Sequence, residues 1–453
     1  MAIPAWLRFL GDVPVDLQAP LMSLFHQAGI DTSATPPPTC MLGIAVLAQP
    51  DEHALNTLRE LCQGCSVLAV AVGDRPFDPA AMWRVLDAGA TDLLLWHELP
   101  PNADEGACRL QRWQTIRALV ESDTVRQRVA GSSCAWQSLI RDVVEVARLT
   151  QSAVLITGET GTGKEQVANL IHELDGREDV GEFVVVDCTT LSAELSGSEF
   201  FGHERGAFTG AAGARDGAFA MAHRGTLFLD EVGELSAALQ AQLLRVVQER
   251  QYKRLGSNTW QRSDFRLICA THRDLEAAVA EGTFRADLYY RIAAWRCTTP
   301  PLRERLEDII PLVHFMLEQL DARAAQLEMD PAVKQYLLTR EYPGNVRDLR
   351  QTVARLWQRH SGDGPLTVGD VPEHERPSSA ACRPLWPDRH FDDAVRHAVE
   401  LGIGLKEIGQ IAAELATQAA LDQEGGNLQR AAARLGVTDR ALQIRRANQR
   451  AAH

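Results

Sequence analysis

The sequence predicts an α/β protein of several domains, with parallel β-sheets in its first two thirds and an all-α region at its C-terminus. Two observations predict this class. Short, continuous apolar runs, which suit strands buried on both faces of a parallel sheet, alternate with helix-like stretches as far as about residue 300. Beyond that point the apolar periodicity is helical. At roughly 150 residues per domain, the 453 residues allow about three domains.

Composition and charge indicate what kind of protein this is and which partners it can have. Hydrophobic residues make up 45% and charged residues 23%, as in ordinary folded proteins. The 46 basic and 60 acidic side chains give a formal charge of −14, so contact with nucleic acid needs a local basic patch. The nine cysteines are scattered and odd in number, which indicates reduced thiols and a cytoplasmic protein. No stretch approaches the ~20 apolar residues of a membrane-spanning helix, so no membrane partner is expected.

The N-terminal part of the chain divides into two βα regions. Residues 1–125 are predicted to form a small βα domain with strands at Met41–Ala48, Val67–Val72 and Leu93–Trp96. Residues 126–300 are predicted to form a larger one. Its buried-strand candidates are Ala153–Ile156, Phe183–Val186, Thr226–Leu229 and Phe265–Ala270.

The remainder of the chain is helical in pattern and is interrupted once. Residues 301–370 form the first helical region. Residues 371–392 are rich in Pro, Ser and charge without apolar periodicity, which indicates a linker. Residues 393–453 are helical again and form a separate C-terminal domain.

A glycine-rich loop follows the first strand candidate of the second region. The segment Gly158-Glu-Thr-Gly-Thr-Gly-Lys164-Glu165 lies between an apolar strand and a helix-like stretch, as a phosphate-binding loop does. Glycines let backbone N–H groups converge on phosphates, and Lys164 supplies positive charge for the β- and γ-phosphates. Glu165 replaces the Ser or Thr that usually ligates magnesium. The expected nucleotide-binding residues are Gly158, Glu159, Thr160, Gly161, Thr162, Gly163, Lys164 and Glu165; the alternative is a glycine turn without a ligand.

Two carboxylates end a later strand candidate. The segment Gly225-Thr-Leu-Phe-Leu-Asp230-Glu231 places them where a parallel sheet presents its ligands. Asp230 is expected to hold Mg²⁺ through water, and Glu231 to polarise the attacking water. A solvated strand end is the alternative for this motif alone, and the upstream loop favours the catalytic interpretation.

The segment between these motifs resembles a known family. Glu199-Phe-Phe-Gly-His-Glu-Arg-Gly206-Ala-Phe208-Thr209-Gly210-Ala211 contains the hexapeptide GAFTGA and resembles the bacterial sigma-54-dependent transcription activators, also called enhancer-binding proteins. The resemblance implies a flexible loop in which Phe208 and Thr209 contact sigma-54. From the residues alone, the segment is a flexible loop with an exposed aromatic or equally a packed surface turn. The hexapeptide comprises Gly206, Ala207, Phe208, Thr209, Gly210 and Ala211.

The resemblance continues through residues 130–360 and implies an AAA+ ATPase domain with ATP and Mg²⁺ as cofactors. It implies an α/β subdomain over residues 126–300 and a helical lid over residues 301–370. Arg285 and Arg291 lie in FRADLYYR, which resembles the segment whose two arginines reach the nucleotide of the neighbouring subunit. Arg347 lies in YPGNVRDL, which resembles the second sensor motif and links the lid to the nucleotide. The apolar side chains on one face of the helix after it are Val346, Leu349, Val353 and Leu356.

Two positions depart from the family pattern. Asp187 stands at the end of the second strand, where the family commonly has an Asn that holds the catalytic glutamate in an inactive pose. A carboxylate that faces Glu231 would need a proton, water or cation between them, so the switch is expected to work differently. The first sensor position, often Asn, is His272, whose ring can still donate a hydrogen bond.

The C-terminal tail carries the local basic patch. From Gly425 to His453 six arginines and one acid give 6 − 1, or +5. An apolar stripe (Leu428, Ala431, Ala432, Leu435), a turn at Gly436 and a helix cap at Thr438 predict two short helices in a helix-turn-helix, which resembles the Fis-type domain of the family. A solvated basic helix is the alternative. Contacts with double-stranded DNA are expected from Arg440, Gln443, Arg445 and Arg446.

Residues 1–125 resemble a response-regulator receiver that lacks the receiver's chemistry. Trp6–Asp12 corresponds to the first strand, and Val85–Asp92 to the late helix-to-strand turn. The strand candidate that ends near Leu47 supplies no phosphate-accepting aspartate. His97, after Trp96, stands where the receiver's lysine would be. The resemblance therefore implies a degenerate receiver-like regulatory domain, or pseudo-receiver.

The combined expectation is a cytoplasmic ATPase that assembles with itself, from dimers to a hexameric ring. It would bind upstream DNA and use ATP hydrolysis to remodel sigma-54 RNA polymerase for open-complex formation. One alternative is a DNA-binding regulator whose ATP site is structural and which acts independently of sigma-54. Another is a chaperone-like remodelling ATPase, which the hexapeptide and the basic tail together disfavour.

Overall fold

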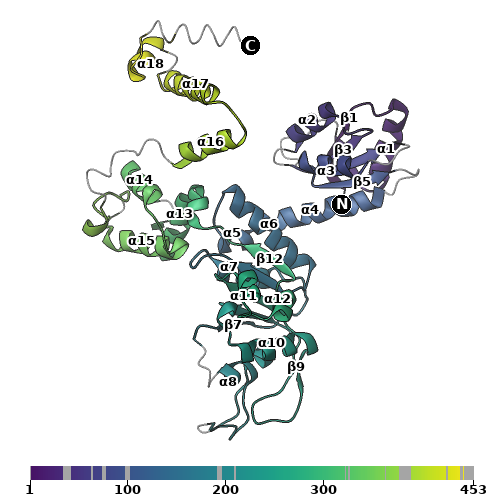
Figure 1. Ribbon diagram of the computed structural model, residues 1–453, viewed down its shortest axis with the longest axis vertical. Coiled ribbons are helices and arrows are strands. Elements are labelled where there is room, and N and C mark those ends of the chain that lie inside the picture. The colour runs from purple at the N-terminus through teal and green to yellow at the C-terminus, as the bar shows by residue number, and fades with distance from the viewer. Residues whose placement is uncertain are drawn as a thin grey trace. The chain divides into compact units, whose positions relative to one another are not determined.

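The computed structural model describes most of the chain and divides it into two compact units, residues 1–373 and 374–453. Figure 1 shows the elements of each unit. The structure describes residues 2–33, 42–62, 65–73, 78–96, 103–190, 196–208, 211–321, 323–324, 327–362, 364–376, 389–424, 427–438 and 442.

The first unit begins with a five-stranded parallel sheet in the order β2-β1-β3-β4-β5, the order of flavodoxin-like doubly wound folds. Apolar side chains of α1 and α4 cover one face of it, and those of α2 and α3 cover the other. This coverage explains why every residue of β3 is buried. The strands are β1 (Ile3–Leu10), β2 (Ile30–Ser33), β3 (Leu42–Leu47), β4 (Ser66–Val72) and β5 (Asp92–Trp96). The helices are α1 (Val15–Gln27), α2 (Glu52–Leu61), α3 (Pro79–Asp87) and α4 (Ala103–Val120).

Helix α4 belongs to two hydrophobic cores. Leu110 is buried in the core of the first sheet, and Ile116 is buried among residues of the second. Arg112 also forms an ion pair with Glu145 on α6 (Cys134–Leu149), the helix that follows α5 (Asp123–Arg128). One helix therefore joins the packing of both sheets.

The second sheet is also parallel, with five strands in the order β12-β6-β11-β8-β7. Its strands are β6 (Val154–Thr157), β7 (Phe183–Asp187), β8 (Thr226–Asp230), β11 (Arg266–Thr271) and β12 (Trp295–Thr298). The sequence-based strands agree with β6, β7, β8 and β11 to within one residue at each end, whereas β12 was not predicted. A short antiparallel pair, β9 (Gln251–Tyr252) and β10 (Gln261–Arg262), lies outside this sheet.

The helices of this region pack on the second sheet. Apolar residues of α6 and α7 belong to one buried cluster, and those of α8, α9, α10, α11 and α12 to another. The helices are α7 (Lys164–Glu173), α8 (Ser196–Phe201), α9 (Ala218–Met221), α10 (Ala237–Glu249), α11 (Leu275–Ala280) and α12 (Ala286–Ile292).

A small helical subdomain with its own core follows the second sheet. Its helices are α13 (Ile309–Leu320), α14 (Pro331–Thr339) and α15 (Asn345–Arg359). Of the four apolar residues predicted to share a face of α15, Leu349, Val353 and Leu356 are fully buried in this core. Val346 is only partly buried, because it faces a cavity described below.

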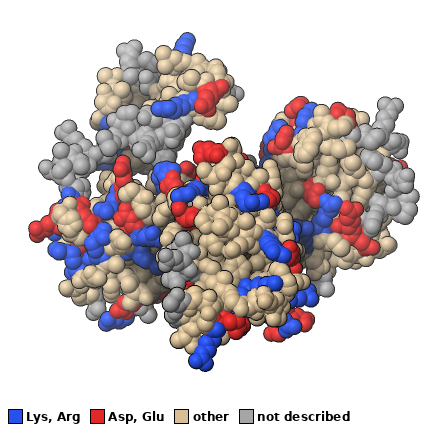
Figure 2. Space-filling model, turned by 60° about the horizontal axis from the view of Figure 1, so that its bottom comes forward, with Lys and Arg blue, Asp and Glu red and all other residues tan. Residues whose placement is uncertain are grey.

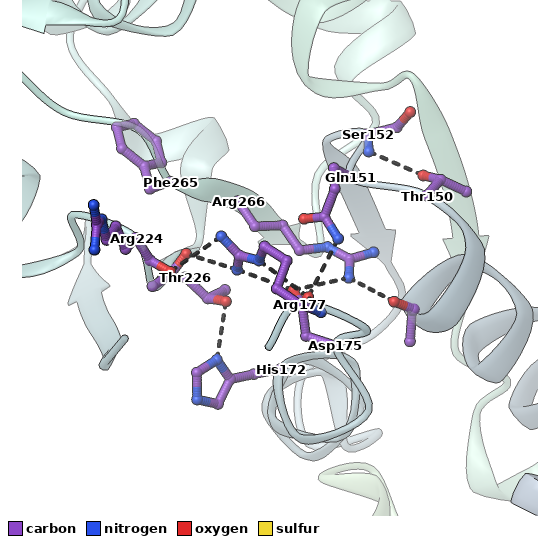
Figure 3. A network of polar contacts seen from close by, with 12 residues as sticks. Thr150, Gln151, Ser152, His172, Asp175, Arg177, Arg224, Thr226, Phe265 and Arg266 are labelled. Atoms are coloured by element: carbon purple, nitrogen blue, oxygen red, sulfur yellow. Dashed lines mark hydrogen bonds and ion pairs between the residues drawn. The ribbon is translucent and has the colours of Figure 1, made fainter. Parts of the chain in front are cut away.

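A buried polar network closes the amino-terminal edge of the second sheet (Figure 3). Arg266, at the start of β11, donates to the carbonyls of Val146 and Ala147 in the last turn of α6, at 2.9 Å each. Its guanidinium lies 3.4 Å from Asp175, whose carboxylate also accepts two bonds of 3.0 Å from the guanidinium of Arg177. Each buried charge thus has a partner, as burial requires. The network fixes the C-terminal ends of α6 and α7 at the edge opposite the glycine loop.

The second unit contains three described helices, α16 (Arg389–Glu400), α17 (Leu405–Gln423) and α18 (Leu428–Arg434). The Asn427 side chain caps α18 by accepting from two backbone N–H groups at 3.1 and 3.2 Å. Gly436, with φ +66°, follows α18 and gives the expected turn. Arg440, Gln443, Arg445 and Arg446 lie outside the described residues. No helix in the described part of the chain is long and apolar enough to cross a membrane.

Candidate functional site

The glycine loop runs from the end of β6 to the start of α7. Gly158, Gly161 and Gly163 have φ values of 146°, 78° and 106°. A Cβ atom at Gly158 would lie 2.1 Å from Oγ1 of Thr299, and one at Gly161 would lie 2.2 Å from the carbonyl oxygen of Gly344. At both positions the backbone conformation and the close neighbours therefore require glycine.

Lys164 is the first residue of α7 and is almost completely buried. Its Nζ donates to the carbonyl oxygens of Gly158 at 2.9 Å and Glu159 at 3.3 Å. The same nitrogen lies 3.5 Å from Oε1 of Glu231. The lysine charge and the helix N-terminus thus lie together beside the glycine loop, an arrangement that favours an anion.

One cavity of about 200 Å³ gathers most of the expected nucleotide site. Its walls come from the glycine loop, the end of β8 and the start of α15. Two exposed arginines of α15, Arg347 and Arg350, line part of the wall. In Figure 2, basic side chains gather in the region that α14 and α15 occupy in Figure 1. The lining residues include Thr160, Gly161, Gly163, Lys164, Glu165, Asp230, Glu231, Arg347 and Arg350.

A second cavity of about 100 Å³ adjoins the first, since Gly163, Gln166, Val346 and Arg350 line both. Its other walls combine apolar residues with the polar or charged Gln127, Arg128, Thr162, Arg305 and Gln319. The lining there includes Val129, Ala130, Trp136, Leu312, Phe315 and Met316. The cavity that contains both carboxylates and Lys164 therefore adjoins one that is richer in apolar side chains.

The two carboxylates of β8 differ in environment. Burial, together with the neighbouring Glu231 carboxylate, raises the pKa of Asp230. Burial opposes ionisation of Glu231 too, but its pKa is lowered, because the backbone N–H and ring of His272 and the charge of Lys164 outweigh that effect. Glu231 has a left-handed backbone, with φ 53°. Both carboxylates line the first cavity.

The described hydrogen bonds of the Asp187 carboxylate go to Thr189 and not to Glu231. Asp187 pairs with Asp230 in the strand register, but its Oδ1 accepts from the backbone N–H and the hydroxyl of Thr189, at 2.8 and 2.6 Å. Oε2 of Glu231 instead accepts from the backbone N–H and from Nδ1 of His272, at 3.0 and 2.7 Å. The structure thus brings His272, and not Asp187, to the catalytic candidate.

Asn345 joins the lid to the glycine loop, an interaction that the sequence did not predict. This buried residue has φ 51°, a conformation that Asn tolerates better than most residues. Its amide nitrogen donates to Oε2 of Glu159 and to the carbonyl of Thr160, both at 3.1 Å. Its amide oxygen accepts from the backbone N–H of Leu302 at 2.8 Å. The only sequence signal was an Asn directly after Pro-Gly, at the start of a helix.

Arg303 and Arg305, which the sequence also did not predict, donate hydrogen bonds to the same loop. Arg303 donates to both carboxylate oxygens of Glu159, at 2.8 and 2.6 Å. With Asn345, this ion pair lowers the pKa of Glu159 to about 2. The buried Arg305 donates to the carbonyl of Thr162 at 2.8 Å, and burial lowers its pKa to about 10.

Arg285, which precedes α12, and Arg291, in its last turn, do not line the cavity of their own chain. Arg285 pairs with Asp287, at 3.0 and 2.7 Å. Arg291 donates to the carbonyl of Val247 at a longer 3.4 Å. Neither interaction brings a guanidinium to the glycine loop of the same subunit.

The hexapeptide forms a closed loop at its described positions. The backbone N–H of Gly206 donates to Ala211, and that of Ala211 donates to Phe208, at 3.0 Å each. Phe208 is 40% exposed and lies against the ring of His203, with 5.0 Å between the ring centroids. Thr209 and Gly210 lie outside the described residues. An exposed aromatic at the end of a hydrogen-bonded loop is available to a partner.

Comparison with known proteins decides the family. Residues 129–298 match the model of the sigma-54 interaction domain, and residues 303–384 match that of the AAA+ ATPase lid domain. Transcriptional regulatory protein ZraR of Klebsiella oxytoca is 39% identical over 326 residues, which cover 72% of this chain and 69% of ZraR. The chain belongs to the sigma-54-dependent transcriptional regulators. The family predicted from the GAFTGA segment is thus confirmed.

Other relatives of this sigma-54 regulator match different shares of it. The Nif-specific regulatory protein of Herbaspirillum seropedicae is 49% identical over 237 residues, which cover 52% of this chain but only 43% of that protein. Among solved structures, NtrX from Brucella abortus in complex with ATP is 27% identical, covers 98% of this chain and 99% of that chain, and has a TM-score of 0.49. By the 43% coverage above, the chain spans less than half the length of the Nif-specific relative.

Proposed function

We propose that this sigma-54 regulator is a transcription activator that hydrolyses ATP to remodel sigma-54 RNA polymerase for open-complex formation. The observation that carries the proposal is the cavity that brings Lys164, the Asp230–Glu231 pair and Arg347 together from three distant segments. A positive charge at a helix N-terminus beside two strand-end carboxylates suits a nucleotide with a divalent cation. The intact GAFTGA segment directs that activity to sigma-54.

The two adjoining cavities suit the two halves of ATP. The charged one has Lys164 and the backbone of the glycine loop for the phosphates, with Arg347 on the lid. The second cavity offers the aromatic side chains of Trp136 and Phe315 to a base. Asp230 would hold Mg²⁺ through water, since carboxylate oxygen is a preferred donor for this ion, and the ion would neutralise phosphate charge.

Glu231 is the proposed general base. Its lowered pKa keeps it ionised near neutral pH, so it can accept a proton from an attacking water. Lys164 would stabilise the charge that develops on the phosphates. Arg285 and Arg291 would act on the nucleotide of the neighbouring subunit in a ring, because neither lines the cavity of its own chain.

We propose that the remaining domains direct and regulate this ATPase. The C-terminal helices would form a DNA-binding helix-turn-helix, supported by the cap at Asn427, the turn at Gly436 and the basic residues beyond it. The doubly wound N-terminal sheet would be a pseudo-receiver, because its fully buried β3 contains no carboxylate. Acetyl phosphate with magnesium should accordingly leave the mass and the ATPase rate unchanged.

Complementation between two inactive variants tests the proposed ring. Lys164→Ala removes the positive charge that would bind the phosphates within a subunit. Arg291→Ala removes the arginine that a subunit would contribute to the nucleotide site of its neighbour. Each variant alone should lack ATP turnover. Mixed rings should recover part of it, because some interfaces then combine an intact glycine loop with an intact Arg291. Failure to recover turnover in rings verified as mixed by mass would refute the assignment in trans.

A further inference from the structure

Both carboxylate oxygens of Glu231 are engaged within the described structure. Oε2 accepts from the backbone N–H of His272 at 3.0 Å and from its Nδ1 at 2.7 Å. Oε1 lies 3.5 Å from Nζ of Lys164. A general base must direct a free lone pair at the water that it activates. Glu231 is therefore held in a pose in which its carboxylate serves the protein's own donors.

Asp187, at the end of β7, cannot restrain the Glu231 carboxylate in this pose. An ionised carboxylate is only an acceptor, so Asp187 has no proton to donate to Glu231. The Asp187 side chain is also committed to the backbone N–H and hydroxyl of Thr189. Like charge at this position would repel Glu231 rather than retain it.

His272, directly after β11, restrains the Glu231 carboxylate instead. Since the ionised Glu231 can only accept, Nδ1 of His272 carries the proton in their 2.7 Å bond. The backbone bond would persist with any residue at position 272, whereas the ring bond depends on the histidine. The loop after His272 is fixed, because Arg273 donates to the Gly233 carbonyl at 3.2 Å and to Glu234 at 2.6 Å. The His272 side chain is 44% exposed, so its ring can swing away without disturbing the core.

We propose that His272, which directly follows β11, parks Glu231 between catalytic cycles: it holds the carboxylate on the protein's own donors. The inference rests on the proposed ATPase function. It makes His272 a positioning residue: the ring must release Glu231 before the carboxylate can accept a proton from water. The backbone N–H of His272 can stay bonded to Oε2 of Glu231 and so keep the carboxylate near the nucleotide cavity.

Substitution of His272 tests the parking role through the separation of kcat from KM. His272→Ala should raise the basal kcat about two- to tenfold, because removal of one charge-assisted hydrogen bond shifts the carboxylate towards its free pose. The KM and the affinity for a fluorescent ATP analogue should stay within about twofold, since His272 does not line the nucleotide cavity. His223→Ala is the matched control: this histidine lies before β8, at the opposite edge of the sheet, and should leave kcat unchanged.

A second variant tests whether a donor at the end of β7 can take over. Asp187→Asn, added to His272→Ala, introduces an amide donor at the end of β7, opposite Asp230 in the strand register, and should lower kcat again towards the wild-type value. A fall or no change in kcat for His272→Ala, with ATP affinity retained, would overturn the parking role and leave the ATPase assignment intact. Failure of the wild-type protein to bind or hydrolyse ATP would instead refute the proposed function.

Discussion

The side-chain amide of Asn345 donates to Oε2 of Glu159 at 3.1 Å and so joins the first residue of the lid helix α15 to the phosphate loop. The same amide donates to Thr160 and accepts from Leu302. Because the charged cavity lies between this loop and α15, these bonds set the position of the lid over the nucleotide site.

Replacement of Asn345 should loosen the lid. Asn345→Ala removes three hydrogen bonds and places Ala at φ 51°, so unfolding free energy should fall by about 2–4 kcal/mol. Urea unfolding measures this decrease. Asn345→Gly is the matched control, since it accepts the backbone conformation and removes only the side-chain bonds; it should be less destabilised than Asn345→Ala. Equal stability of Asn345→Ala and the wild type would show that these bonds do not restrain the lid.

The Glu159–Arg303 pair should contribute a pH-dependent part of stability. The pKa of Glu159 is lowered to about 2, so the ionised form stabilises the folded state. That contribution is fully present above the ordinary carboxyl pKa of about 4.3 and is lost as the pH falls from there towards 2. The difference in unfolding free energy between wild type and Glu159→Gln should be constant from pH 5 to 7 and shrink below about pH 4. A difference independent of pH from 7 down to 3 would contradict this assignment.

Thr209→Ala should separate hydrolysis from activation. The described residues of the hexapeptide do not line the nucleotide cavity, so ATP turnover should remain within about twofold of wild type. Activated transcription in a purified sigma-54 system should be abolished, because the loop is the proposed contact with sigma-54. Normal activation by Thr209→Ala would favour a regulator that acts independently of sigma-54.

The basic tail should bind the DNA. Replacement of both Arg445 and Arg446 by Ala should weaken DNA binding and flatten its salt dependence, by roughly one unit of log–log slope for each arginine–phosphate ion pair that is removed. Fluorescence anisotropy of a labelled duplex at several salt concentrations measures the slope. An unchanged slope with normal affinity would move the DNA-binding surface elsewhere on the protein.

The sequence predicted the parts of the fold that depend on local pattern. The apolar runs of β6, β8 and β11 are long enough to identify, and their parallel order brings the glycine loop and the Asp230–Glu231 pair to one edge. Strand β12 was missed because WRCT mixes polar and apolar residues and is only partly buried.

The interactions that were missed join residues far apart in sequence. Arg303 is 144 positions from Glu159, and Asn345 is 186 positions from it. Glu231 and His272 are likewise 41 positions apart, so their hydrogen bond could not be predicted from local sequence. A motif reports the residue types at such positions, whereas the partner of each side chain depends on how the strands and the lid are packed.

Promoter melting is the most direct test of whether ATP hydrolysis by this protein drives open-complex formation. A sigma-54 promoter fragment with a fluorescent base analogue in the region that opens, together with purified sigma-54 RNA polymerase, reports open-complex formation. We expect a fluorescence rise with the wild-type protein and ATP, and no rise with Lys164→Ala, with Glu231→Gln or without nucleotide. Glu231→Gln should still bind ATP, because it loses only water activation. Equal melting by Lys164→Ala and wild type, or melting without ATP, would contradict the claim that hydrolysis drives remodelling.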